Sequence, residues 1–213
     1  MREQSEPGER AKIGSVVLAA GRSSRMGAHK LLLPLGGRAL VTYAVAAACA
    51  SMADPVVVVL GHDADRVRAA LAQGRYRTVT NAAYGEGMAT SLRAGLAALP
   101  PVAGAIVILA DQPLMTAAAM DAVIAEARRH PGAVVRAAYE GRAGHPVCFP
   151  ARLFPELLAA TGDEGGRAVL GRHRGEVRLV ELGAPALDLD VDEPDQYEAL
   201  RRAWEGHSDV AES

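Results

Sequence analysis

Residues 13–37 read IGSVVLAAGRSSRMGAHKLLLPLGG, an apolar run that passes directly into a glycine-containing loop. The run at 13–18 has the length and the β-branched content of a buried strand. In a parallel sheet, the loops at the carboxyl ends of the strands form the ligand crevice. Glycines let backbone N–H groups turn toward a phosphate, and Arg22, Arg25 and Lys30 supply positive charge. The stretch therefore predicts a strand followed by a loop that binds a triphosphate.

Two better-known phosphate-binding loops do not fit this stretch. A dinucleotide-binding loop needs the pattern GxGxxG, but no glycine lies between Gly21 and Gly27. A P-loop needs glycine and lysine followed by serine or threonine, whereas Gly27 is followed by Ala28 and His29. Because glycine turns are common, the stretch taken alone is also compatible with a plain connecting loop.

The 213-residue chain has the composition of one ordinary globular domain. Half of the residues are hydrophobic and 23% are charged, which excludes a mainly disordered chain. The formal net charge of -2 gives no large electrostatic footprint for nucleic acid or an anionic membrane. We predict a flexible tail at 1–12, a single domain at 13–205 and a second flexible tail at 206–213.

The opening segment 1–12 is polar and carries charges of both signs, unlike a signal peptide. No apolar run approaches the ~18 residues of a membrane span. The two cysteines form neither a disulfide framework nor a zinc pattern. These features predict a cytoplasmic protein with no nucleic-acid or membrane partner.

Short β-rich runs alternate with alanine- and leucine-rich stretches, which is typical of βαβ units. We therefore expect an α/β fold with a mostly parallel sheet covered by helices on both faces. The expected strands are 13–18, 55–60, 77–80, 105–110, 133–138 and 146–149, with weaker candidates at 177–182 and 187–191. The expected helices are 39–51, 64–73, 88–99, 116–130, 152–160, 166–171 and 194–204.

Carboxylates are expected at the same edge of the sheet as the loop. Asp111 directly follows the apolar strand 105–110. Mg²⁺ is usually held by one or two carboxylates together with substrate phosphate oxygens. Asp188, Asp190 and Asp192 alternate along the chain and would repel one another on one side of an extended strand. A pairing of Asp111 with Asp190 or Asp192 around Mg²⁺ relieves this repulsion; a solvated strand edge or a helix N-cap stays open.

Three further segments place polar groups near the starts of predicted elements. Asn81 and Ser91 could face a ribose or base, or they could cap the following helix. His145 precedes a strand in the segment GHP, where a structural hydrogen bond competes with a role as a base. Asp163 and Arg167 in GDEGGR could lie near an anionic substrate or belong only to a capped turn.

Taken together, these segments occur in the order found in the molybdenum-cofactor nucleotidyltransferases, which the chain resembles over about residues 13–203. LAAG at 18–21, MG at 26–27, Lys30 and the strand-end Asp111 are shared with the wider nucleotide-diphospho-sugar transferase-like superfamily. GHP and GDEGGR narrow the resemblance to the molybdenum-cofactor branch. Within it the chain is most similar to the molybdopterin cytidylyltransferases, because Ala20 stands where the guanylyl branch more often has glycine. At 190–194 the chain reads DVDEP, and Glu193 replaces the threonine common in the branch, so the choice of metal-binding aspartate stays open.

The resemblance implies a Rossmann-like α/β nucleotidyltransferase fold and transfer of CMP from CTP to the phosphate of molybdopterin, with release of pyrophosphate. It implies that Arg25, Lys30 and Asp111 act in catalysis and that Asp111 binds Mg²⁺ with Asp192 or Asp190. The implied nucleotide contacts are Leu18, Ala19, Ala20, Gly21, Arg22, Lys30, Asn81, Gly87 and Ser91. The implied acceptor contacts are Gly144, His145, Pro146, Asp163 and Arg167.

The implied partners are CTP, molybdopterin and a recipient molybdoenzyme of the xanthine dehydrogenase type. Three alternatives stay open. The first two are a GTP-dependent molybdenum-cofactor guanylyltransferase and a sugar-phosphate nucleotidyltransferase, which differ in base or acceptor. The third is a non-catalytic carrier of the nucleotide or cofactor, which would bind without releasing pyrophosphate.

Overall fold

The computed structural model describes residues 12–22, 29–183 and 190–211. Its strands are β1 (Ile13–Ala19), β2 (Pro34–Leu35), β3 (Arg38–Ala39), β4 (Val56–Leu60), β5 (Arg77–Thr80), β6 (Gly104–Leu109), β7 (Val134–Tyr139), β8 (Arg142–Pro150) and β9 (Val177–Glu181). Its α-helices are α1 (Val41–Ala50), α2 (Ala64–Ala70), α3 (Met88–Ala98), α4 (Ala117–Arg129), α5 (Phe154–Ala159), α6 (Arg167–Arg172) and α7 (Pro194–Ala211). Short 3-10 turns are η1 (Lys30–Leu32), η2 (Tyr84–Glu86), η3 (Ala151–Leu153), η4 (Gly162–Glu164) and η5 (Arg174–Glu176).

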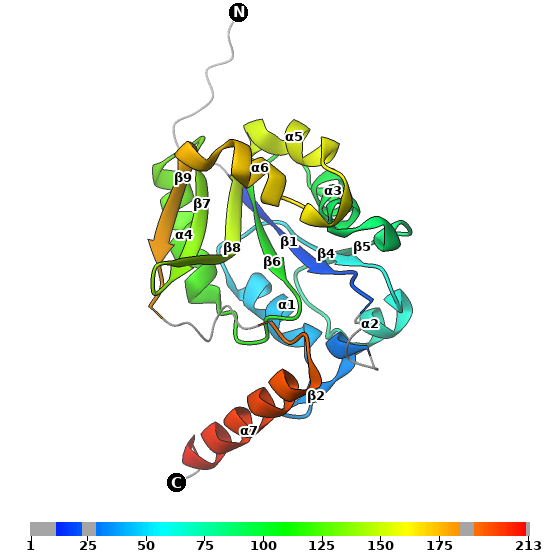
Figure 1. Cartoon of the computed structure of the whole chain (residues 1–213). Coiled ribbons are helices and arrows are strands. Elements are labelled where there is room, and N and C mark those ends of the chain that lie inside the picture. The colour runs from blue at the N-terminus through cyan, green and yellow to red at the C-terminus, as the bar shows by residue number, and fades with distance from the viewer. Residues whose placement is uncertain (1–11, 23–28, 184–189, 212–213) are drawn as a thin grey trace, which may run out of the picture.

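Seven of the strands form one twisted sheet in the order β5-β4-β1-β6-β8-β7-β9 (Figure 1). β1 pairs in parallel with β4 and β6, and β4 pairs in parallel with β5. β8 is antiparallel to both of its neighbours, whereas β7 and β9 are parallel. The expected α/β fold with a mostly parallel sheet is therefore confirmed, with β8 as the exception.

The alternation of side chains along the central strands builds one hydrophobic core on each face of the sheet. In β1, Val17 packs in the core that includes α1, α2 and α4, while Val16 packs in the core that includes α3, α5 and α6. The run Val56–Leu60 is buried throughout, as expected for a parallel strand covered on both sides. Helices cover both faces of the sheet, and the loops that follow β1, β4 and β6 lie at the carboxyl edge of these strands.

A tight hairpin reverses the chain between β7 and β8. Tyr139 pairs with Arg142, so Glu140 and Gly141 form a two-residue loop. Both loop residues have positive φ, 52° and 76°, as a type I′ turn requires. This turn explains why β8 runs antiparallel to β7 and β6 and why it extends beyond the expected strand 146–149.

A small hairpin and the last helix form a third hydrophobic cluster at one end of the molecule. Gly36 and Gly37, with φ of 52° and 76°, turn the chain between β2 and β3. Leu35, Leu40, Val191 and Leu200 are buried together, and in Figure 1 helix α7 projects from the domain beside β2. Among the described residues, no helix has both the length and the apolar character needed to cross a membrane.

Two expectations for the C-terminal segment need correction. A strand at 187–191 is wrong for Asp190 and Val191, because the Val191 N–H donates a single bond to the Asp111 carbonyl rather than joining a ladder; residues 187–189 lie outside the described part. The helix expected at 194–204 continues to Ala211, since no proline interrupts it. The predicted tail at 206–213 therefore overlaps the end of α7, and the domain limits stay a prediction.

Candidate active site

The carboxyl ends of β1, β4 and β6 are tied together at one edge of the sheet. The Ala110 N–H donates to the Leu18 carbonyl at 3.0 Å, and the His62 N–H donates to the Ala20 carbonyl at 3.3 Å. A cavity of about 650 Å³ opens at this edge. It is lined by many residues predicted for the site: Leu18, Ala20, Gly21, Arg22, Lys30, Gly87, Ser91, Asp111, His145, Asp163, Arg167, Asp190 and Asp192.

Lys30 bridges two carboxylates that are far apart in the sequence. Its Nζ donates to Oδ2 of Asp111 at 2.5 Å and to Oδ1 of Asp192 at 2.6 Å. The Lys30 and Asp111 side chains are 12% and 18% exposed, whereas Asp192 is 40% exposed. Burial acts to lower the pKa of Lys30, but the charges and hydrogen bonds of the two carboxylates outweigh it, so this pKa is raised. The Lys30 side chain therefore stays protonated at neutral pH and places a positive charge at the edge of the cavity.

The carboxylate pair has the donor chemistry that a hard divalent cation requires. Both side chains contact a single ammonium group, so the space between them already accommodates a cation. Among the described residues, no group of three or more His, Cys, Asp or Glu side chains is arranged to hold a metal. Two carboxylates completed by substrate phosphate oxygens are nonetheless a common Mg²⁺ arrangement. The residues fit such an ion, and Asp190 lines the same cavity.

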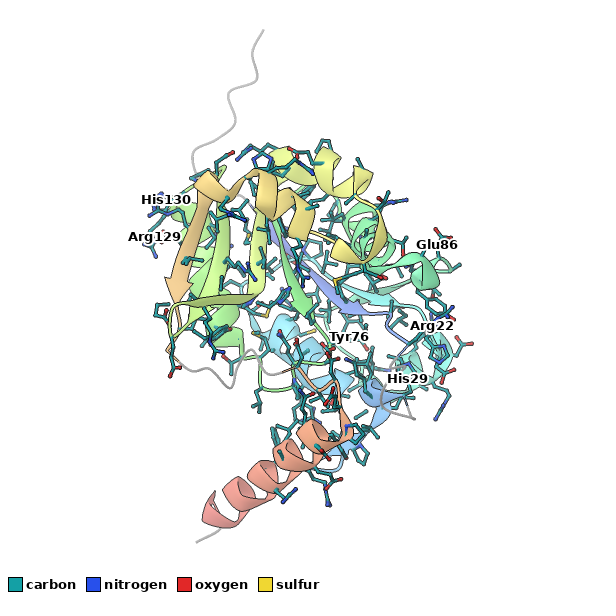
Figure 2. All side chains as sticks on the ribbon, viewed as in Figure 1. Arg22, His29, Tyr76, Glu86, Arg129 and His130 are labelled. Carbon is teal, nitrogen blue, oxygen red and sulfur yellow. The ribbon has the colours of Figure 1, made fainter. Side chains whose placement is uncertain are left out.

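A row of aromatic rings extends from Arg22 and Tyr84, which line the cavity. The Arg22 guanidinium lies 5.2 Å from the centre of the Tyr84 ring, which lies 5.9 Å from the His62 ring. The His29 ring stacks on His62 at 5.4 Å with an angle of 3° between the planes. Figure 2 shows Arg22 and His29 on one side of the molecule, with Arg129 and His130 on the other. Sequence reasoning missed Tyr84, although its neighbours in the segment YGEG were expected near the nucleotide.

Asn81 organises the loop before α3 instead of lining the cavity. Its side-chain amide donates to the hydroxyls of Thr90 at 2.8 Å and Ser91 at 2.9 Å, and its Oδ1 accepts from the Ala83 N–H at 3.0 Å. Ser91 itself lines the cavity. The alternative that Asn81 caps α3 is wrong, because Gly87 is the N-cap of this helix and no side chain caps it. Direct nucleotide contact by Asn81 stays a prediction.

Arg136 and Tyr139 of β7 fix the segment that carries His145. The Arg136 side chain donates to the carbonyls of Gly144 at 2.9 Å and Ala143 at 3.0 Å, and the Tyr139 hydroxyl donates to the His145 carbonyl at 2.5 Å. The register of β7 and β8 shifts between Arg136 and Ala138, and these side-chain bonds fall at that irregularity. Arg136 also lines the cavity, and its only signal in the sequence is an arginine inside an apolar strand.

Two glycines bring together the segment predicted to contact the nucleotide and the segment predicted to contact the acceptor, because Gly87 touches Gly162. Gly87 has a φ of 111°, and a Cβ there would lie 2.4 Å from the carbonyl carbon of Gly162. Glycine at 87 is thus required by backbone conformation and by contact with η4. At Gly21, by contrast, a Cβ would meet nothing within 4 Å, so the protein's own packing does not require glycine there.

Several predicted residues do not line the cavity. Ala19 points into the core on the α1 side of the sheet, and Gly144 and Pro146 lie beside His145 in β8 without lining the cavity. Arg25 and Asp188 lie outside the described residues. The cavity also has an apolar wall that no sequence pattern predicted, formed by Leu31, Leu92, Val107, Leu109, Val147, Phe149 and Leu170.

Two curated proteins of similar length are similar in sequence to this chain over most of its length. One named nicotine blue oxidoreductase, from Paenarthrobacter nicotinovorans, is 33% identical over 197 residues, which cover 88% of this chain and 96% of that protein. The purine catabolism protein PucB of Bacillus subtilis is 31% identical over 199 residues and covers 88% of this chain and 95% of its own.

Solved structures agree with the observed fold. The homologue of Mycobacterium tuberculosis Rv0371c from Mycobacterium sp. strain JC1 is 33% identical, with a TM-score of 0.80 and coverage of 92% of this chain and 98% of its own. A nucleotidyl transferase from Methanothermobacter is 26% identical, with a TM-score of 0.79 and coverage of 92% and 99%. Residues 15–177 match the model of the MobA-like NTP transferase domain. The chain therefore belongs to the MobA-like NTP transferase family and is a nucleotidyltransferase of this Rossmann-like fold.

Proposed function

We propose that the protein transfers CMP from CTP to the terminal phosphate of molybdopterin, releasing pyrophosphate and forming a dinucleotide cofactor. The observation that carries this proposal is the convergence of Lys30, Asp111 and Asp192 at the carboxyl edge of β1 and β6. It joins a cation and two carboxylates in a cavity that is also lined by Arg136, His145 and Arg167. This arrangement suits two phosphorylated substrates.

The reaction needs no strong base. The second pKa of a phosphate monoester is about 6, so its oxygen is largely ionised at neutral pH. That oxygen attacks the α-phosphorus, the bond between the α-phosphorus and its bridging oxygen breaks, and the electron pair leaves with pyrophosphate. The protein aligns the two phosphates and stabilises charge, with Lys30 and Arg22 facing the triphosphate. Asp163 and Arg167 contribute on the acceptor side.

A divalent ion completes this site. Asp111 and Asp192 would hold it, and Asp190 lines the same cavity. When bound, it supplies charge neutralisation at the phosphates. The related Rv0371c from Mycobacterium tuberculosis, 30% identical with a TM-score of 0.76, has been crystallised with manganese, which supports the proposal. We propose Mg²⁺ as the natural ion and the cytoplasm as the location, with a molybdoenzyme of the xanthine dehydrogenase type as recipient.

Ala20 is the proposed selector of the base. Its side chain is 4% exposed, lines the cavity and packs against Gly61, where a Cβ would lie 2.7 Å from the Ala20 methyl. A larger purine has less room beside this methyl than beside a glycine. Replacing Ala20 with glycine should therefore shift the ratio of kcat/KM values from CTP toward GTP by about tenfold or more. If the ratio of kcat/KM values for CTP and GTP did not change, Ala20 would not select the base.

The test is Mg²⁺-dependent pyrophosphate release from CTP, GTP and ATP, each with and without molybdopterin. Release from CTP only when molybdopterin is present is the expected result. Release with GTP would indicate a guanylyltransferase, and release with a sugar 1-phosphate would indicate another acceptor. Tight binding without release would indicate a carrier. Because one relative is named an oxidoreductase, consumption of reduced nicotinamide cofactors is measured in parallel, and turnover there without pyrophosphate release would contradict the proposal.

A further inference from the structure

Lys30 occupies the position between the two carboxylates that the proposed function assigns to the divalent ion. Its Nζ contacts one oxygen of Asp111 and one oxygen of Asp192, at 2.5 and 2.6 Å. Its side chain is only 12% exposed, so the ammonium group is largely withdrawn from water. A divalent ion held by both side chains must use the carboxylate groups that now bind this ammonium.

We propose that Lys30 is an internal competitor of the divalent ion, closing the carboxylate pair until a nucleoside triphosphate draws its ammonium group away. This inference rests on the proposed function. The triphosphate offers strong charge-assisted hydrogen bonds to Lys30, which replace those to Asp111 and Asp192. The released carboxylates then bind the divalent ion together with phosphate oxygens. Nucleotide and metal thus bind cooperatively, and the empty enzyme binds metal weakly.

The local structure lets the Lys30 side chain move without disturbing the fold. Lys30 begins the three-residue turn η1, and in this turn Leu31 is buried in the core and holds the backbone in place. The Lys30 side chain itself lines the cavity that would receive the triphosphate. Asp111 and Asp192 belong to separate segments, joined by the bond from the Val191 N–H to the Asp111 carbonyl at 3.2 Å. The carboxylates therefore stay together when Lys30 leaves.

The test is titration of the metal alone. Mn²⁺ binding to the full chain is measured by electron paramagnetic resonance, without nucleotide and then with α,β-methylene-CTP. Lys30→Met should bind Mn²⁺ at least about tenfold more tightly than the wild type without nucleotide, because the competing ammonium is gone. The nucleotide analogue should increase the Mn²⁺ affinity of the wild type much more than that of Lys30→Met.

Arg22→Met is the matched control, because it also removes one positive charge from the cavity. The Arg22 guanidinium stacks on Tyr84 rather than on the carboxylates, so without nucleotide its loss should change Mn²⁺ affinity by only about twofold. Equal gains in both variants would indicate a general field effect and overturn the proposal. An unchanged or weaker affinity in Lys30→Met would also overturn it.

Circular dichroism verifies that the variants are folded. If Lys30→Met does not fold, Lys30→Gln keeps an N–H donor without the charge and carries the same expectation. Adding Asp192→Asn to the lysine variant should lower Mn²⁺ affinity again, which identifies the carboxylate pair as the binding site. The readout needs neither CTP transfer nor molybdopterin. Absence of CMP transfer would therefore contradict the proposed function without contradicting the competition between Lys30 and the metal. Conversely, an unchanged Mn²⁺ affinity in the lysine variant would contradict the competition without contradicting CMP transfer.

Discussion

At the scale of single residues, replacing Asp111 should impair catalysis without impairing folding. Asp111→Asn removes one of two carboxylates that bind Lys30 but leaves Lys30 paired with Asp192, so the buried ammonium keeps a carboxylate partner. Turnover should fall at least about a hundredfold, because alignment of the metal and phosphate is lost. The melting temperature should change little. Steady-state pyrophosphate release and a thermal melt measure the two effects, and loss of the fold in step with activity would contradict the assignment.

Gly87 joins the segments predicted to contact the nucleotide and the acceptor, so its replacement should affect both substrates. Gly87→Ala forces a side chain into a backbone with φ of 111° and against the Gly162 carbonyl. We expect destabilisation of about 1–3 kcal/mol and higher KM values for nucleotide and acceptor. Gly171→Ala in helix α6 is the control, since a Cβ there meets nothing within 4 Å. Similar urea midpoints for the two variants would show that the contact with Gly162 is unimportant.

At the scale of elements, a histidine connects α5 to the end of α6. His173 Nε2 lies 2.8 Å from Glu156, and its Nδ1 lies 2.7 Å from Glu176. Hydrogen bonds to Glu176 and Glu156 raise the pKa of His173 above 6.5, while hydrogen bonds from His173 lower the pKa of both glutamates below 4.5. The histidine's stabilisation is complete below pH 6.5 and is lost as pH rises through its folded pKa. The stabilisation by the two glutamates is complete above pH 4.5 and is lost as the pH falls through their pKa values in the folded protein.

This cluster should therefore stabilise the protein most between pH 4.5 and 6.5. His173→Gln should cost most stability in this window, and the difference from the wild type should shrink as the pH rises above 6.5. Urea unfolding over a pH series measures the difference. A difference that stayed constant with pH would show that the contribution of His173 is packing rather than charge.

Helix α7 contacts the segment of Asp192, because the Asp192 N–H donates to Gln196 Oε1 at 2.8 Å and Val191 is buried with Leu35 and Leu200. Trp204, which packs α7 against Tyr43 of α1, should therefore influence the site from a distance. The Trp204 ring lies edge-on to Tyr43 with centroids 4.9 Å apart, and the Tyr197 hydroxyl donates to the Pro34 carbonyl at 2.5 Å. Trp204→Ala should cost about 2 kcal/mol and weaken Mn²⁺ binding in the presence of nucleotide. Trp204→Phe keeps the ring contact, so it should lose less stability and less Mn²⁺ affinity than Trp204→Ala.

Trp204 is the only tryptophan of the chain, so its fluorescence reports this contact directly. In the wild type, the emission should shift to the red when α7 leaves the hairpin. Equal Mn²⁺ affinities for the two Trp204 variants would show that α7 does not position Asp192.

The same elements show what sequence patterns can and cannot predict. The strand before Gly21 and the strand before Asp111 were predicted correctly, because buried parallel strands are continuous apolar runs. The β2–β3 hairpin was missed, since strands of two residues have no measurable period. The direction of β8 was missed because periodicity carries no direction, although the Glu140-Gly141 turn carried a signal.

At the scale of the whole molecule, the site depends on contacts that no local pattern contains. Lys30 meets Asp192 across 162 positions of sequence, and the aspartates near the C-terminus lie beyond the matched domain at 15–177. The spacing of residues could suggest a carboxylate partner for Asp111, but only the fold places a lysine between the two. The role of Arg136 could not be predicted from the sequence either, because it depends on a register shift between β7 and β8.

One measurement tests the central claim most directly. The protein is incubated with CTP labelled with ³²P at the α-phosphorus, Mg²⁺ and molybdopterin, and the products are separated. We predict that the label moves from CTP into a dinucleotide containing the acceptor, at a rate that Asp111→Asn lowers at least about a hundredfold. Label that remains in CTP, or that appears in free CMP equally with and without acceptor, would contradict nucleotidyl transfer to this acceptor.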